Sequence, residues 1–205
     1  MNTDLGKPGL VWLPCQEVMY VECVRALLPV AATAPVGSVV RFESDHCTLA
    51  AKRNAAVASL LASPTLKWLL MVDSDMVPPP DVLQRLQRHG EAIVGAVCFQ
   101  RKPPYAACVH PKGDQRLVLG AGLAEVEAVG TGCLYIRRRA VEGWPHPWFM
   151  ADKDDVREDI YFCHTARTLG WRVYVDTGCV VGHVHPMAVT DQWPARGLPR
   201  AEVAA

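Results

Sequence analysis

Short apolar runs alternate with stretches of helical spacing along the first third of the chain, and this alternation limits the fold more than any other feature. Apolar runs at 9–13, 36–42 and 67–72 predict three strands. Between them, residues 17–31 and 49–62 carry apolar side chains three and four positions apart, which predicts two helices. Strands joined by helices form parallel sheets, so we expect an α/β fold with a mostly parallel central sheet flanked by helices.

The second half of the chain is less regular. Around Pro103-Pro104 and Lys112-Gly113-Asp114 the periodicity is lost, so we expect a small antiparallel excursion within residues 101–127. The other elements that we expect are, in chain order, a helix at 81–89, strands at 92–99 and 133–137, a helix at 159–169, and strands at 171–175 and 179–184.

The length of 205 residues suits a single domain, which we place at 1–190, followed by a flexible tail at 191–205. Lys plus Arg and Asp plus Glu number 21 each, which excludes an overall basic field for holding nucleic acid or an anionic membrane. The apolar runs are too short to span a membrane and the first residues lack a signal-peptide layout, so we expect a cytoplasmic protein. Eight cysteines without a C-x-x-C pair predict reduced, mostly buried thiols.

Two acids stand directly after the apolar run that ends at Val72. Asp73 and Asp75 are separated by one residue, and side chains two positions apart on an extended chain point the same way. Ligands of open α/β sheets bind beyond the carboxyl ends of the strands. Carboxylate oxygens suit Mg²⁺ or Mn²⁺, which bind substrate phosphates through one or two protein carboxylates. The spacing therefore predicts a site for a metal ion and a diphosphate.

Two other interpretations of this acid pair remain. Asp73 and Asp75 can simply cap a turn before the next helix. With Val77 they also resemble the D-x-D-x-[TV] motif of haloacid dehalogenase-type phosphatases, in which the first acid is the nucleophile. That motif should close the first strand, whereas two strand–helix units precede it here, and no G-D-x-x-x-D cluster follows. We therefore favour a metal site over a phosphoryl acceptor.

Several segments together resemble a GT-A-fold glycosyltransferase of the family 2 type. Their order and intervals are similar to that family over about residues 9–185, and the resemblance implies a GT-A version of the Rossmann-like sheet. The segments are Ala51-Lys52-Arg53-Asn54-Ala55, the strand end at Asp73-Ser74-Asp75-Met76, Gly130-Thr131-Gly132-Cys133, Glu158-Asp159-Ile160-Tyr161-Phe162-Cys163, and Gly182-His183.

The resemblance implies a hexosyltransferase-like enzyme that uses a nucleotide-sugar donor, UDP-sugar favoured, with Mn²⁺ or Mg²⁺ bridging the diphosphate. Asp73 is implied to lie toward the ribose or sugar and at the metal, and Asp75 to bind the metal directly. His183 resembles the histidine that completes the metal site, and imidazole beside carboxylates favours Mn²⁺. His185 is an alternative ligand, and either histidine can instead be a hydrogen-bonded core residue.

The same resemblance assigns the remaining roles. Asp159 is implied to be the base of an inverting transfer, with Glu158 as a positioning neighbour, and an N-terminal helix cap is the alternative. The donor side is implied to involve the helix-start residues, the end of the first strand and a glycine that lets the backbone approach the ligand. These donor-side residues are Lys52, Arg53, Asn54, Pro14, Glu17 and Gly132.

The acceptor and the partners are less constrained by the sequence. Trp144, His146 and Trp148 predict an aromatic lip for the acceptor, and a packed core would give the same pattern. The acceptor can be a saccharide, a lipid, a protein or a modified nucleic-acid base, and oligomerisation is possible. A noncatalytic nucleotide-sugar-binding module is a further alternative, because such a module would share the donor site.

Overall fold

The computed structural model describes residues 4–15, 18–151 and 157–185. The helices are α1 (Val21–Thr33), α2 (Leu49–Ala62), α3 (Val82–Arg88), α4 (Arg138–Val141) and α5 (Glu158–Thr168). The strands are β1 (Leu10–Pro14), β2 (Val39–Glu43), β3 (Trp68–Val72), β4 (Met76–Val77), β5 (Ile93–Val97), β6 (Val109–Pro111), β7 (Leu123–Val129), β8 (Cys133–Arg137), β9 (Val173–Val180) and β10 (Gly182–His183).

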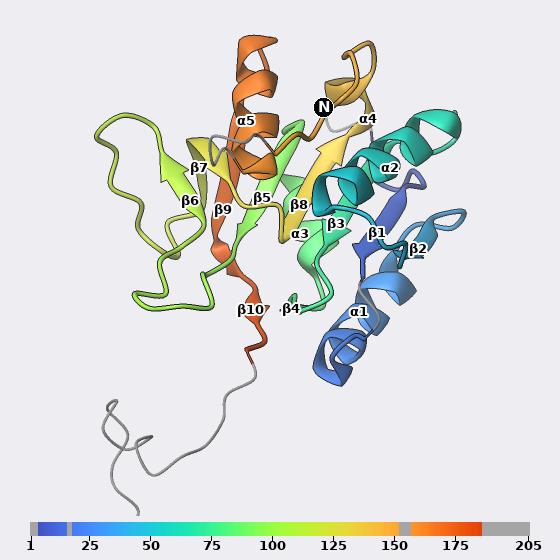
Figure 1. The fold of residues 1–205 in the computed structure, drawn as a ribbon, viewed down its shortest axis with the longest axis horizontal. Coiled ribbons are helices and arrows are strands. Elements are labelled where there is room, and N and C mark those ends of the chain that lie inside the picture. Colours follow the sequence, from blue (N-terminus) through green and yellow to red (C-terminus); the bar gives the residue numbers. More distant parts are fainter. Residues whose placement is uncertain (1–3, 16–17, 152–156, 186–205) are drawn as a thin grey trace, which may run out of the picture.

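The main sheet has eight strands in the order β2-β1-β3-β8-β5-β9-β7-β6 (Figure 1). Pairs β1–β2, β1–β3 and β5–β9 are parallel, whereas β8 is antiparallel to both of its neighbours. Because β7 is also antiparallel to both neighbours, six strands run one way and only β7 and β8 run the other. The expected α/β fold with a mostly parallel sheet and a small antiparallel part is therefore confirmed.

Local sequence explains why α2 begins and ends where the periodicity predicts. Thr48 is the N-cap, and its side chain accepts a hydrogen bond of 3.2 Å from the Ala51 N–H. At the other end Arg138 donates to four carbonyl oxygens, those of Leu60, Leu61, Ser63 and Leu66. The guanidinium thus satisfies acceptors that a helix leaves open at its C-terminus.

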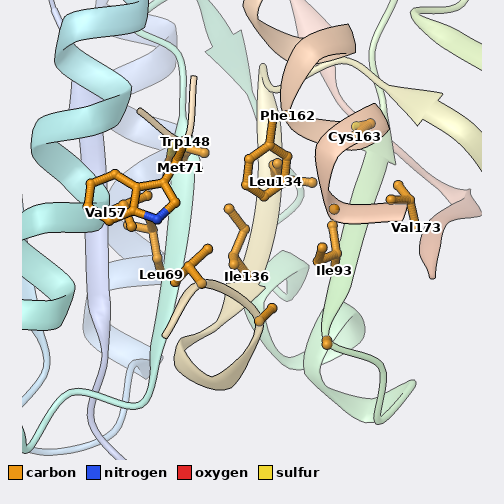
Figure 2. Packing of buried hydrophobic residues seen from close by; sticks show 14 of the residues in the cluster. Val57, Leu69, Met71, Ile93, Leu134, Ile136, Trp148, Phe162, Cys163 and Val173 are labelled. Atoms are coloured by element: carbon orange, nitrogen blue, oxygen red, sulfur yellow. The ribbon is translucent and has the colours of Figure 1, made fainter. Parts of the chain in front are cut away.

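The central strands are buried on both faces, because helices cover the sheet on each side. Five consecutive residues of β3 are fully buried, so alternate side chains enter two separate apolar clusters. Leu69 and Met71 pack with Val57 of α2 and Phe162 of α5 on one face (Figure 2). The other cluster contains side chains of α1 and α3, among them Leu27 and Leu83. This packing fixes the strand ends that carry the polar residues described below.

The predicted aromatic lip is wrong. Trp144, Trp148 and Phe149 are buried in the core, and the Phe149 ring stacks on Phe162 with centroids 4.5 Å apart. Trp144 stacks on the same ring at 5.2 Å. Of the predicted lip only His146 is exposed, because the apolar area of the two indoles is better buried than left at the surface.

Two details of the chain path differ from the prediction. Residues 173–180 form one strand, β9, where two were expected. The register of β9 against β5 shifts between Ala96 and Val97, and within β9 the Gly178 N–H donates to Asp176 Oδ1 at 2.9 Å. The antiparallel excursion is confirmed as β6 and β7, although β7 continues to Val129. Within the described ranges no helix is both long and apolar enough to cross a bilayer.

Candidate functional site

A cleft of about 1180 Å³ with several charged side chains in its lining lies at the carboxyl ends of β1, β3 and β5. Asn54 is absent from its wall, and Glu17 lies outside the residues that the structure describes. The cleft is otherwise lined by the predicted site residues Pro14, Lys52, Arg53, Asp73, Asp75, Gly132, Glu158, Asp159 and His183, together with others that include Cys15, Tyr20, Cys47, Arg101, Cys108 and Arg157.

The two acids after β3 do not share one direction. The strand ends at Val72, and residues 73–76 form a turn closed by a 3.0 Å hydrogen bond from the Met76 N–H to the Asp73 carbonyl. The rule for side chains two positions apart applies to extended chain, and this turn is not extended. That both carboxylates face one cation therefore stays a prediction. Asp73 turns to Arg53, and Asp75 turns to the C-terminal part of the chain.

Asp75 lies next to His183 because β4 and β10 pair in a two-stranded sheet (Figure 1). Strand β10 pairs antiparallel with β4, and the Val184 N–H donates to the Asp75 carbonyl at 2.8 Å. This pairing places His183 Nε2 3.2 Å from Asp75 Oδ2, whereas His185 is exposed. Two residues 108 positions apart are thereby brought to one point of the cleft.

The second ring nitrogen of His183 is also fixed. Its Nδ1 lies 2.7 Å from the Phe99 carbonyl oxygen, which can only accept, so Nδ1 carries the proton. Nε2, which faces Asp75 Oδ2, is then the ring nitrogen left to bind a cation. A backbone carbonyl that orients the far nitrogen is the usual support of a metal-binding histidine.

One carboxylate and one imidazole fit a divalent cation that takes its other ligands from water and substrate. Mg²⁺ and Mn²⁺ commonly bind in this way, and an imidazole beside a carboxylate favours Mn²⁺ of the two. No group of three His, Cys, Asp or Glu side chains in the described ranges is arranged to hold a metal ion. The donor set therefore fits a cation shared with a bound diphosphate better than a closed structural site.

Arg53 is the most buried charged side chain of the cleft, with 1% of its surface exposed. Its Nη1 and Nη2 lie 3.0 Å from the two carboxylate oxygens of Asp73, and its Nε lies 3.4 Å from Glu158 Oε1. Nη1 also donates to the Thr131 carbonyl at 3.3 Å. Burial lowers the pKa of Arg53, but the charges of Asp73 and Glu158 more than offset this and raise it. The guanidinium is thus held by protein groups.

The neighbours of Arg53 on α2 are also engaged with the protein. The Lys52 ammonium donates to the Cys15 carbonyl and lies 3.5 Å from the Glu43 carbonyl, at the ends of β1 and β2. Asn54 Nδ2 donates to the Phe149 carbonyl at 2.7 Å, and Oδ1 accepts the N–H of Trp148 and of Phe149 at 2.9 and 3.0 Å. The expectation that Asn54 binds the donor is corrected, because its amide holds a backbone loop.

Glu158 and Asp159 begin α5 and line the cleft. Asp159 is 4% exposed, and its Oδ2 lies 3.5 Å from the Arg157 guanidinium. Its Oδ1 accepts the Ile160 N–H at 2.9 Å. Glu158 points to Arg53, so the two acids of the pair have different surroundings.

Gly132 and Gly130 let the backbone pass close to neighbouring side chains. A Cβ atom on Gly132 would lie 2.6 Å from Met76 Cε, and one on Gly130 would lie 2.8 Å from Cys108 Cβ. The Gly132 carbonyl accepts the Asp73 N–H at 2.9 Å. These glycines therefore let the backbone lie against Met76 and Cys108 in the cleft lining.

Sequence reasoning missed Arg101. It follows β5 by a few residues, lines the cleft and places Nη1 3.0 Å from Asp75 Oδ2. Its position just beyond a strand, at the same sheet edge as Asp73, was the available signal.

Comparisons with known proteins agree with this architecture. No known protein-family profile matches the chain. A segment of 55 residues is 44% identical to mannan polymerase complex subunit mnn9 of Schizosaccharomyces pombe, and the match covers 26% of this chain and 16% of that protein.

Three solved structures share the fold. A197 from STIV aligns with a TM-score of 0.69 at 19% identity, over 87% of this chain and 86% of that one. GalNAc-T7, solved with UDP, GalNAc and Mn²⁺, aligns with a TM-score of 0.60 at 9% identity, over 87% of this chain and 44% of that one. The catalytic domain of Drosophila beta1,4galactosyltransferase 7, solved with xylobiose, aligns with a TM-score of 0.50 at 17% identity, over 88% and 71%. The chain therefore has a GT-A-type fold, similar to that of these glycosyltransferases.

Proposed function

We propose that the protein is a metal-dependent glycosyltransferase that moves a hexose from a nucleotide-diphosphate sugar, UDP-sugar favoured, to an acceptor hydroxyl. The observation that carries the proposal is the approach of His183 Nε2 to Asp75 Oδ2 within a cleft at the sheet edge. The GT-A-type fold supports it, and so does the GalNAc-T7 structure, which holds UDP and Mn²⁺.

The cation site is assigned to Asp75 and His183. Phe99 orients the imidazole, and the pairing of β10 with β4 holds both ligands in register. When bound, the divalent cation supplies positive charge that stabilises the departing diphosphate. Asp73 is assigned to the sugar-donor side, where its carboxylate would accept hydrogen bonds from the nucleotide sugar. Arg53 fixes that carboxylate at the cleft wall.

Asp159 is assigned as the base of an inverting transfer. The acceptor oxygen forms a bond to the anomeric carbon, the bond from that carbon to the diphosphate oxygen breaks, and the hydroxyl proton passes to Asp159. Its buried position on the cleft wall allows a bound hydroxyl to be held within hydrogen-bond reach. Glu158 is assigned a positioning role, because its carboxylate contacts Arg53.

No observation favours the phosphatase alternative. Both carboxylate oxygens of Asp73 lie 3.0 Å from nitrogens of the buried Arg53, which does not suit a free nucleophile. The acid pair also follows β3, the third strand of the chain.

The cation-dependent part of the proposal predicts that Asp75→Asn abolishes nucleotide binding that requires Mn²⁺. In a thermal-shift screen of nucleotide sugars, the native protein should gain several degrees with UDP-sugar plus Mn²⁺ and little without the metal, by mass action. Asp75→Asn should lose the shift, whereas Asp114→Asn, an exposed acid in a distant turn, should keep it. No shift with any nucleotide sugar would count against the proposal.

The catalytic part predicts that Asp159→Asn keeps binding but loses turnover. Removal of a general base lowers kcat by roughly 10²- to 10⁴-fold. Release of UDP from a UDP-sugar, with and without candidate acceptors, measures the effect, and UDP titration checks that binding is retained. A native protein that binds UDP and releases none from any UDP-sugar would instead be a noncatalytic binding module.

A further inference from the structure

We propose that the Arg101 guanidinium holds the cation position on Asp75 when no divalent cation is bound, and moves to the diphosphate when the cation enters. The inference rests on the proposed function, because it concerns the same cation and donor. Arg101 would thus pair with Asp75 in the metal-free protein and with the diphosphate in the metal-bound protein, which couples metal binding to nucleotide binding.

One carboxylate oxygen of Asp75 contacts two cationic or metal-binding side chains. This single oxygen lies 3.0 Å from Arg101 Nη1 and 3.2 Å from His183 Nε2. A cation shared by Asp75 and His183 has to use the same carboxylate and to lie beside the guanidinium. Two positive charges this close repel strongly in a partly enclosed cleft, so metal and guanidinium compete for Asp75.

Arg101 can leave Asp75 easily, because its side chain is exposed to solvent. Its side chain is 48% exposed, whereas that of Arg53 is 2% exposed and is held by two carboxylates and a carbonyl. An exposed ion pair is weak, so a divalent cation can displace Arg101 at small cost. Arg53 has no comparable freedom, because its own charge is buried and its departure would leave two partly buried carboxylates without their partner.

Once released from Asp75, the Arg101 guanidinium can bind the diphosphate of the nucleotide. A planar fork of N–H donors matches phosphate oxygens, and the diphosphate lies next to the cation that displaced it. Lys52 is engaged by backbone carbonyls, and Arg157 is paired with Asp159 and not with Asp75. Arg101 is therefore the cleft cation best placed to contact the diphosphate.

The test measures Mn²⁺ and UDP binding separately in Arg101→Gln. Mn²⁺ alone, followed by the electron paramagnetic resonance signal of the free ion, should bind roughly two- to fivefold more tightly than to the native protein, since a competitor is gone. UDP in saturating Mn²⁺, followed by calorimetry, should bind roughly tenfold more weakly, since a charged hydrogen bond to phosphate is lost. Arg101→Lys should lie between the native protein and Arg101→Gln in both assays.

Lys102→Gln is the matched control, because it removes the same charge from the next exposed residue of the loop. It should leave both affinities near the native values. The inference is overturned if Arg101→Gln leaves Mn²⁺ affinity unchanged or weaker, if UDP affinity is unchanged, or if Lys102→Gln gives the same shifts. A native protein that binds no Mn²⁺ overturns the proposed function itself, which is a different result from normal Mn²⁺ binding that Arg101→Gln does not alter.

Discussion

Arg53 shows how one buried residue can join distant parts of the chain at a site. Its guanidinium joins Asp73, after β3, to Glu158, at the start of α5. The sequence predicted a donor-binding cation from its place near a helix start. That role stays a prediction, and the structure adds which protein groups satisfy the guanidinium, since one removed from water needs carboxylate and carbonyl partners.

A second buried charge lies away from the cleft, at Asp176 in β9. Asp176 is 3% exposed, its Oδ2 lies 3.0 Å from His89 Nε2 and 3.4 Å from Arg85 Nη2, and Gly178 donates to Oδ1. Burial raises the pKa of Asp176, but the hydrogen bonds and charges around it outweigh burial and lower it. The ionised carboxylate is therefore the form that the fold favours.

This arrangement predicts that Asp176→Asn destabilises the protein by about 2 kcal/mol at pH 7. A lowered folded-state pKa gives stability that is present above the unfolded-state value, near pH 4, and is lost as the pH falls through the folded-state value. The gap between native and variant free energies of unfolding should thus close in acid. Urea titrations at several pH values measure it, and Asp81→Asn, an exposed acid beside α3, is the control. A gap independent of pH contradicts the prediction.

At the scale of elements, the first turns of α2 distribute three consecutive side chains to three different parts of the fold. Lys52 reaches the ends of β1 and β2, Arg53 reaches Asp73, and Asn54 reaches the loop at 148–149. Successive residues of a helix point about 100° apart, so three consecutive side chains cannot all face one target. This is why only two of the three line the cleft.

The short strand β10 predicts a second outcome at this scale. Val184→Pro removes the N–H that donates to the Asp75 carbonyl, while the extended His183 tolerates a following proline. We expect Mn²⁺ affinity to fall by roughly tenfold, as for the loss of support around a metal ligand, with little change in melting temperature. Val184→Ala keeps the N–H and should bind Mn²⁺ normally. Equal Mn²⁺ affinities in the two variants contradict this role for β10.

At the scale of the whole molecule, the cysteines differ in how accessible their thiols are, because some lie in the core and others line the cleft. All eight are free, six are buried and Cys47 is exposed. Burial raises the pKa of Cys23 to about 11, of Cys163 to about 12 and of Cys179 to about 11. Thiolate is the reactive form, so these thiols should react only when the fold opens.

We therefore expect Cys47 to react first with a thiol reagent, and the buried cysteines to react only at the rate of unfolding. Because Cys47 lines the cleft, UDP with Mn²⁺ should slow its modification. Absorbance with Ellman's reagent follows the reaction, and Cys47→Ser should remove the fast phase. Prompt reaction of most thiols in the folded protein, or a fast phase insensitive to the ligands, contradicts the expectation.

The sequence by itself determined the elements and their sheet class. The helix at 49–62 and the strand at 133–137 have the bounds that periodicity predicts, and the strand–helix alternation yields the mostly parallel sheet. It also indicated which residues gather at the sheet edge, since nine of its site residues line the cleft. These features follow from patterns within a few residues, which local spacing and strand ends reveal.

Only the tertiary structure decided which of those residues face one another. The turn at 73–76 separates Asp73 from Asp75, β10 selects His183 over His185, and Arg101 reaches Asp75 from the loop after β5. Likewise the indoles of the predicted lip belong to the core. Side-chain partners such as Asp75 and His183 stand 108 positions apart, and no local period carries information over that separation. Contacts of this kind are fixed by packing and strand pairing, which exist only in the folded chain.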